Sequence, residues 1–168
     1  TVTDESGGSG VDLDSVAVRL DGTAVSAAEV THTAITNGYS FTYTPSAAMG
    51  DGAHTVSVEA ADNDGNAAAA KSTTFTVDTV PPALNVTSPA EGLVTATAAL
   101  AVSGTTNDAT SSPVVITVTL NSADQGPVTV QANGAFSKTV TLAEGANTIV
   151  VTATDAAGKV STVTRNVT

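Results

Sequence analysis

Two adjacent prolines near the middle of the chain, Pro81 and Pro82, constrain the fold more than any other sequence feature. Proline fixes its own φ angle, offers no backbone N–H, and pushes the preceding residue into an extended conformation. No helix or central strand can run through this point. We therefore predict a stiff, extended joint between two domains, residues 1–80 and residues 81–168.

The two halves carry the same pattern of short strands and turns. Residues 51–66 match residues 144–159 at a constant offset of 93 positions. In each half, an acid-Gly-Ala turn opens an alternating strand that ends at a turn beginning with Asp. The apolar positions of an earlier strand also correspond: Val16, Val18 and Leu20 with Ile116, Val118 and Leu120. Repeats of short alternating strands predict an all-β chain of two tandem β-sandwiches.

The composition favours small cores of aliphatic residues. Aromatic residues make up 3% of the chain and Trp is absent, so Val, Ile, Leu and Ala must fill both cores. β-Branched residues suit strands. The chain has no Cys, which excludes disulfides and thiolate metal sites.

Several segments have a local pattern that assigns them directly. Residues 24–36 predict either a short helix or an irregular edge strand, and Asn37-Gly38 predicts a turn. Tyr39, Phe41 and Tyr43 then fall on one face of a strand. We expect a last strand of the first half at 74–77 and a long strand at 95–105.

Together, the acid-Gly-Ala turn, the alternating Val strand, the Asp-x-x-Gly turn and the closing Asp-Thr-Val-Pro-Pro at 78–82 resemble bacterial immunoglobulin-like domains. Such domains occur in tandem arrays in bacterial surface proteins and adhesins, and as accessory modules of secreted polysaccharide enzymes. The resemblance covers nearly the whole chain. It implies an immunoglobulin-like sandwich in each half and a place outside the cell or on its surface.

The first half departs from this family pattern at its start. In the second half, residues 83–106 precede the loop at Asn107-Asp108, which leaves room for strands A and B. In the first half, only residues 1–3 precede the corresponding Asp4. We therefore expect the first sandwich to lack strand A and most of strand B. Either upstream residues of a longer parent protein supply these strands, or a neighbouring subunit donates one.

The net charge of −11 is concentrated in the first half. Residues 1–80 hold eleven acidic and two basic residues, whereas residues 81–168 hold five acidic and three basic residues. A field of this sign argues against binding to nucleic acid or anionic membranes, and it is compatible with divalent cations. No apolar run is long enough to span a bilayer, and no signal peptide or initiator Met is recognisable. We expect a processed form or a piece of a longer protein.

The residues do not form a recognisable catalytic set. His32 and His54 lie in unrelated contexts, and no serine lies in a Gly-x-Ser-x-Gly elbow. The Gly-rich stretch at 7–10 is short, has acidic surroundings and is not followed by a helix, so it does not predict phosphate binding. Carboxylates cluster in loops, but a glycosidase also needs aromatic platforms around its cleft. We predict that the chain is not an enzyme.

The acidic loops are the candidate binding sites. Residues 62–66 place Asp and Asn oxygens around Gly65, which resembles the start of a calcium loop without the Glu that closes an EF-hand. The B–C and F–G loops of an immunoglobulin-like domain share one pole, so a Ca²⁺ site could form there. The candidate ligands are Asp4, Glu5, Asp12, Asp62, Asp64 and Asn66, with a second candidate set of Asp78, Asn107, Asp108 and Asp155. Alternatively, these residues are present because Asp and Asn favour turns.

These features predict a non-catalytic, extracellular structural or spacer module of a bacterial surface array or adhesin, with calcium as a candidate stiffening ion. One alternative is a subunit of an extracellular filament completed by strand donation. Another is a module of a secreted enzyme or adhesin that binds carbohydrate or a host surface. The expected partners are neighbouring immunoglobulin-like domains or copies of this chain, without nucleic acid or membrane insertion.

Overall fold

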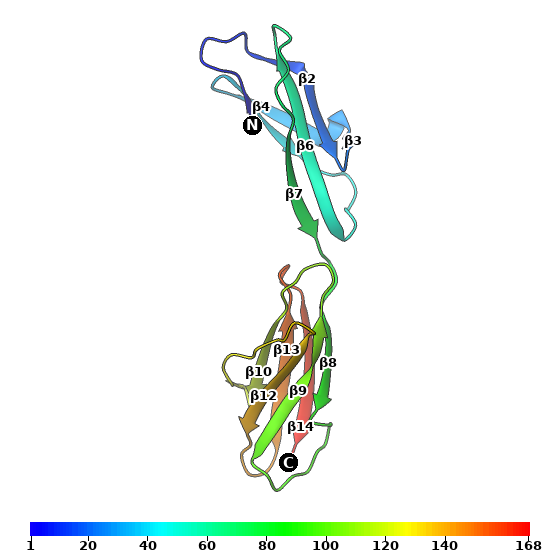
Figure 1. Cartoon of the computed structure of the whole chain (residues 1–168), viewed down its shortest axis with the longest axis vertical. Helices are drawn as coiled ribbons and strands as arrows, with labels where there is room; N and C mark the ends of the chain where they lie inside the picture. Colours follow the sequence, from blue (N-terminus) through cyan, green and yellow to red (C-terminus); the bar gives the residue numbers. More distant parts are fainter. The chain divides into compact units, whose positions relative to one another are not determined.

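The computed structural model describes all residues from 1 to 168 and divides into two compact units, Thr1–Val77 and Asp78–Thr168. Apart from one short 3₁₀ turn at Ala27–Glu29, the regular structure consists of β-strands (Figure 1). The predicted all-β fold of two sandwiches is confirmed. No helix has the length and hydropathy needed to cross a membrane.

The second domain, Asp78–Thr168, is a complete sandwich of two antiparallel sheets. One sheet has the order β12-β9-β8, formed by β8 (Ala83–Ser88), β9 (Ala99–Asn107) and β12 (Ala135–Thr141). The other has the order β11-β10-β13-β14, formed by β10 (Val115–Leu120), β11 (Ala123–Asp124), β13 (Asn147–Thr154) and β14 (Val160–Val167). Alternate residues of both sheets point inward, and Val102, Val118 and Ile149 are fully buried between them.

The first domain, Thr1–Val77, has one full sheet and one reduced sheet. The full sheet has the order β3-β2-β6-β7, formed by β2 (Val11–Leu20), β3 (Thr23–Ala24), β6 (Gly52–Asp62) and β7 (Lys71–Val77). The reduced sheet has the order β1-β5-β4, formed by β1 (Val2–Thr3), β4 (Val30–Ile35) and β5 (Gly38–Tyr43). In this sheet β1 pairs with β5 at two positions only, Val2–Tyr39 and Thr3–Gly38, so residues 1–77 themselves do not supply strand A or most of strand B.

This reduced sheet leaves the first domain without a closed core. No residue from Thr1 to Val77 is fully buried, whereas the second domain buries eleven hydrophobic side chains. The sequence patterns of the two domains are alike. The difference in burial therefore follows from the reduced β1-β5-β4 sheet and not from weaker alternation.

The structure resolves the ambiguous segment and corrects two strand boundaries. Residues 24–36 contain both the short 3₁₀ turn, with Ser26 and Glu29 in a capping box, and the edge strand β4. The strand expected at 95–105 begins only at Ala99, because the backbone N–H of Thr95 donates to the Thr168 carbonyl instead. The strand expected at 74–77 begins earlier, at Lys71, where it pairs with Val58 of β6.

In the first domain, the side chains of Asp21 and His54 stabilise the turn after β2. In the second domain, two asparagines, Asn121 and Asn147, occupy the equivalent positions. His54 Nδ1 lies 2.8 Å from Asp21 Oδ2, and His54 Nε2 lies 2.8 Å from the Gly50 carbonyl oxygen. In the second domain, Asn121 and Asn147 hold the equivalent turn through neutral hydrogen bonds. Both partners of His54 are acceptors, so only the imidazolium can donate to both at once. Hydrogen bonding to Gly50, then to Asp21, raises the pKa of His54.

We expect the stability of the first domain to fall as pH rises above neutrality. Because the pKa of His54 is raised on folding, its contribution is fully present below its ordinary value of 6.5 and is lost as pH rises through the folded value. Urea unfolding followed by tyrosine fluorescence between pH 5.5 and 8.5 would measure this loss. The double variant Asp21→Asn, His54→Asn copies the second domain and should remove most of the pH dependence. An unchanged dependence in this variant would contradict the assignment.

Candidate metal centre

Three aspartates from separate segments meet at one end of the second domain. Asp78 precedes β8, Asp108 directly follows β9, and Asp155 directly follows β13. The start of β8 pairs with the end of β9, which places the first two segments side by side. One carboxylate oxygen from each aspartate lies within 4.8 Å of the other two.

Backbone hydrogen bonds fix the orientation of all three carboxylates through their Oδ1 atoms. The donors are the N–H groups of Val80 for Asp78 (3.0 Å), of Thr110 and Ser111 for Asp108 (2.8 Å each), and of Lys159 for Asp155 (2.8 Å). The local chain therefore holds one oxygen of each carboxylate in place.

The remaining oxygens of two of these carboxylates are buried and have no partner. Asp78 is 8% exposed and Asp155 is 5% exposed, and the Oδ2 atom of each accepts no hydrogen bond. None of the three aspartates forms an ion pair with a lysine or arginine. A buried carboxylate oxygen without a donor or a cation is costly. The arrangement is thus suited to a positive ion.

Ser111 ties the loop after β9 to the loop after β13. Its carbonyl accepts from Ala156 N (3.0 Å), and its Oγ accepts from Ala157 N (3.2 Å). Asp108 and Asp155 lie on these two loops. Protein contacts alone therefore hold the two carboxylates near each other.

The three carboxylates could hold a metal ion, and their chemistry suits a hard cation. Ligand oxygens about 2.3–2.6 Å from one Ca²⁺ lie no more than about 5 Å apart, which matches the observed grouping. Carboxylates favour Ca²⁺ or Mg²⁺ over softer metals. Asn107, the fourth candidate of this set, is exposed at the end of β9, directly before Asp108.

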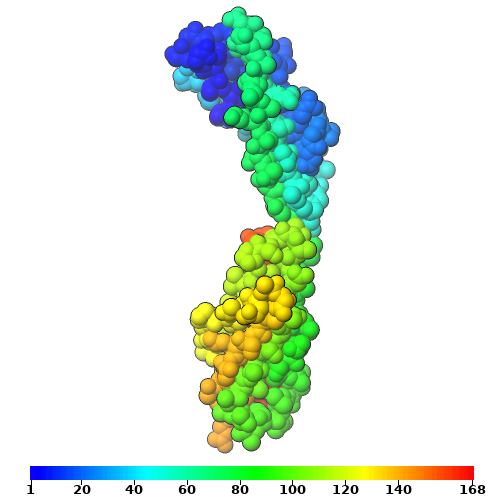
Figure 2. All heavy atoms as spheres, viewed as in Figure 1, coloured from blue at the N-terminus to red at the C-terminus, as the bar shows by residue number.

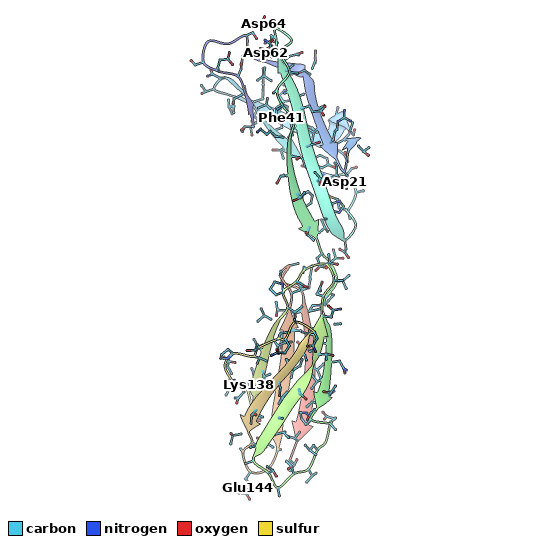
Figure 3. The ribbon with its side chains drawn as sticks, viewed as in Figure 1. Asp21, Phe41, Asp62, Asp64, Lys138 and Glu144 are labelled. Atoms are coloured by element: carbon cyan, nitrogen blue, oxygen red, sulfur yellow. The ribbon has the colours of Figure 1, made fainter.

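The candidate site in the first domain has a different character. Asp4, Glu5, Asp62 and Asn66 line one shallow hollow there. Figure 2 shows the N-terminal residues (blue) against the turn after β6, and Figure 3 shows Asp62 and Asp64 together at this turn. The remaining candidates, Asp12 and Asp64, do not line the hollow.

The carboxylates in this hollow already have hydrogen-bond donors. Asp62 accepts from the backbone of Asp64 and Asn66 through Oδ1, and from the Asn66 side chain through Oδ2 (2.8 Å). Asp4 accepts from the backbone of Glu5 and Gly10. The Asn66 side chain, then its backbone, lowers the pKa of Asp62, while the charge of Asp4 acts in the opposite direction. Neither carboxylate has a buried oxygen left without a partner.

The internal repeat explains why the two poles differ. Asp62 and Asn66 correspond to Asp155 and Lys159 at the 93-residue offset, and the same N–H-to-Oδ1 bond occurs in both pairs. In the second domain, Asp78 adds a third, buried carboxylate ahead of the first strand. Residues 1–77 contribute no third carboxylate to a group of this kind. The sequence pattern that indicates the three-aspartate group is one Asp before the Pro81-Pro82 joint and one Asp directly after each of the strands β9 and β13.

Fold and loop arrangement define a class, that of tandem immunoglobulin-like β-sandwiches. Residues 82–168, more than half of the chain, match the family described as glucodextranase, domain B, and the chain belongs to this family. Residues 6–79 match the bacterial Ig-like domain. The resemblance inferred from the sequence is confirmed. Both matches are to accessory domain types, and neither is to a catalytic domain.

Solved structures share this fold at low sequence identity. The fibronectin(III)-like modules of CbhA from Clostridium thermocellum match with a TM-score of 0.52 and 16% identity, over 98% of this chain and 80% of theirs. Extracellular domains 3–5 of Drosophila OTK match with a TM-score of 0.41 and 14% identity, over 92% of this chain and 51% of theirs. At 16% identity, the first likeness shows the fold alone. None of the curated proteins compared with the chain matches it.

Proposed function

We propose that this chain is a non-catalytic accessory and spacing module of an extracellular bacterial protein, and that its second domain binds Ca²⁺ through Asp78, Asp108 and Asp155. The observation that carries the proposal is the pair of buried, unpartnered Oδ2 atoms on Asp78 and Asp155 beside a third carboxylate. A divalent cation would attract all three carboxylates at once and offset most of their combined charge. Water and backbone carbonyls would complete the six to eight ligands that Ca²⁺ takes.

Bound calcium would also fasten the segment that leads into the second domain. Asp78 immediately precedes the stretch 79–82, which ends in the two prolines. Coordination would tie this stretch to the loops after β9 and β13. A segment with few conformations of its own, anchored at its start, suits a spacing role.

The comparisons support an accessory role in a secreted or surface protein. The family of residues 82–168 takes its name from a domain of glucodextranase, and the CbhA modules of similar fold are described as fibronectin(III)-like. The net charge of −11 keeps such a module soluble at high local density. We propose neighbouring immunoglobulin-like domains of the same parent protein as the partners of this chain.

Calcium titration of the full chain by isothermal calorimetry tests the metal site. After treatment with chelator, we expect one saturable site for Ca²⁺ and weaker binding of Mg²⁺, because Mg²⁺ demands a smaller and more regular ligand shell. Asp155→Asn should abolish binding. Asp62→Asn, the equivalent change in the first domain, should leave it intact. No binding at millimolar Ca²⁺, or a loss of binding in Asp62→Asn, would refute the site.

A polysaccharide panel tests the spacing role separately. A spacer should bind none of the glucans, xylans or host glycans in the panel, with or without Ca²⁺. In the second domain, the one aromatic side chain, Phe136, is 3% exposed and therefore offers no stacking surface to a sugar. Saturable binding to one polysaccharide would identify the chain as a carbohydrate-binding module and leave the metal site standing.

A further inference from the structure

The turns at the ends of β6 and β13 have the same backbone hydrogen bonds in the two domains. In the first domain, Asp62 Oδ1 accepts from the Asn66 N–H (2.8 Å), and the Asp62 N–H donates to the Asn66 carbonyl (3.1 Å). In the second domain, Asp155 Oδ1 accepts from the Lys159 N–H (2.8 Å), and the Asp155 N–H donates to the Lys159 carbonyl (3.1 Å). Residues 66 and 159 are therefore placed alike beside their aspartates.

The side chain at this position decides whether the second oxygen of the aspartate has a donor. In the first domain, Asn66 Nδ2 donates to Asp62 Oδ2 (2.8 Å). In the second domain, the equivalent Oδ2 atom of Asp155 is buried and has no partner. The residue in place of Asn66 there is Lys159. The second domain thus has a cationic side chain where the first has the amide that satisfies the carboxylate.

Lys159 lies on the same side of its hairpin as Asp155. Thr154 and Val160 form the cross-strand pair nearest the turn, and Val160 is 50% exposed. Successive side chains of a strand point to opposite faces, so Asp155 and the half-buried Lys159 both face the inner side. Lysine carries its ammonium on a flexible four-carbon stem. This stem is longer than the Asn66 side chain, which already spans the equivalent distance in the first domain.

The ammonium group of Lys159 is the one cation of the second domain without a hydrogen-bond partner. Lys138 Nζ donates to the Pro127 carbonyl (3.2 Å), and the Arg165 guanidinium donates to three backbone carbonyls. The Lys159 ammonium forms neither a hydrogen bond nor an ion pair. The structure therefore shows the arrangement in which Asp155 Oδ2 is open to an ion.

We propose that Lys159 sets the cation affinity of the three-aspartate group by competing with the ion. When no ion is bound, the Lys159 ammonium folds onto Asp155 Oδ2, the atom whose counterpart the Asn66 amide reaches in the first domain. Ca²⁺ binds by displacing it, and this inference rests on the proposed calcium site. A buried carboxylate without a partner is costly, so a tethered ammonium stabilises the ion-free chain.

The same displacement favours divalent over monovalent cations. Na⁺ would replace one positive charge by another and gain little. Ca²⁺ brings one additional charge to the three carboxylates. Lys159 therefore lowers the affinity for Ca²⁺ and, at the same time, keeps Na⁺ out of the group.

Calcium titration of the full chain by isothermal calorimetry tests the role of Lys159. Lys159→Met keeps the length of the side chain and removes its charge. We expect its Kd for Ca²⁺ to fall about fivefold, the upper end for an exposed ion pair. Lys159→Arg keeps the charge and should bind like the unmodified chain. Lys138→Met is the matched control and should not change the Kd, because Lys138 pairs with Val102 within β9, whereas Asp108 follows the end of that strand.

A second measurement distinguishes ion competition from a purely structural effect. At constant ionic strength, the screening of charges stays the same when Na⁺ replaces the bulky tetramethylammonium ion. This exchange should weaken Ca²⁺ binding to Lys159→Met, because Na⁺ can then enter the group. It should leave Ca²⁺ binding to the unmodified chain unchanged. Equal sensitivity to Na⁺ in the two proteins would contradict the proposed competition.

The calorimetry also has outcomes that would refute the proposal. Unchanged or weaker Ca²⁺ binding by Lys159→Met would do so directly. An equal gain in Lys138→Met would show only a general effect of charge. Tighter binding by Lys159→Arg would show that the ammonium charge is not the cause.

A double-mutant cycle in chelator separates the lysine from the calcium site. Lys159→Met and Asp155→Asn are combined, and urea unfolding of the second domain is followed by circular dichroism. Coupling between the two changes is expected if the side chains meet in the ion-free chain. Coupling without Ca²⁺ binding by the unmodified chain would refute the calcium site and keep Lys159 as the partner of Asp155. Binding without coupling would refute the role of Lys159 and keep the site.

Discussion

Removing calcium is expected to lower the melting temperature of the second domain and leave that of the first unchanged. An ion that binds only the folded state adds about 2.7 kcal/mol when it is present at 100 times its Kd. For a domain of this size, this corresponds to roughly 10 °C or more. Without the ion, Asp78, Asp108 and Asp155 also repel one another across less than 5 Å.

Tyrosine fluorescence can distinguish the unfolding of the first domain from that of the second. Both tyrosines, Tyr39 and Tyr43, lie in the first domain, and there is no Trp. Tyrosine fluorescence therefore follows the first domain, whereas circular dichroism follows both. Chelator should shift a transition seen by circular dichroism and leave the tyrosine transition in place. A shift of the tyrosine transition instead would place the ion at Asp4 and Asp62.

Two variants complete this measurement. Asp155→Asn should melt alike in calcium and in chelator, because it removes one of the three carboxylates from the buried group. Asp62→Asn should keep the full response, because the Asp62 oxygens already accept hydrogen bonds from Asp64 and Asn66. Identical melting of the unmodified chain with and without calcium would contradict the proposed site.

Strand positions could be predicted from the sequence because their signals are local. The alternation of Val56 and Val58 in β6, and of Ile149 and Val151 in β13, is read from neighbouring residues, and each strand pairs as its repeat does. The start of β9 could not be read in this way. The Thr95 N–H donates to Thr168, a residue far away in sequence, and a strand pattern carries no record of such a contact.

The difference between the two candidate metal sites also depends on tertiary contacts that the sequence pattern does not reveal. Asp62 and Asp64 stand out because ligands are dense in their short loop, yet this density supplies donors that satisfy Asp62 locally. Asp78 and Asp155 are isolated in sequence, and burial leaves an oxygen of each without a partner. Burial is a property of the tertiary fold. The sequence could therefore name both sets of residues but not the difference between them.

Truncating a core valine to alanine should destabilise the second domain far more than the equivalent substitution destabilises the first domain. Val118 and Val18 are repeat-equivalent, but Val118 is 0% exposed, whereas Val18 is half-buried and lines an open apolar groove of the first domain. Val118→Ala removes two buried methyl groups and leaves a cavity in a closed core. We expect it to lower the free energy of unfolding by about 2–3 kcal/mol.

Val18→Ala should cost less than about 1 kcal/mol, because the groove leaves part of this side chain in contact with water. Urea unfolding measures both, with circular dichroism reporting Val118→Ala and tyrosine fluorescence reporting Val18→Ala. Thr117→Ala, at the exposed neighbour of Val118, controls for a change of strand propensity alone. Equal losses for the two valines would mean that the first domain is closed in solution.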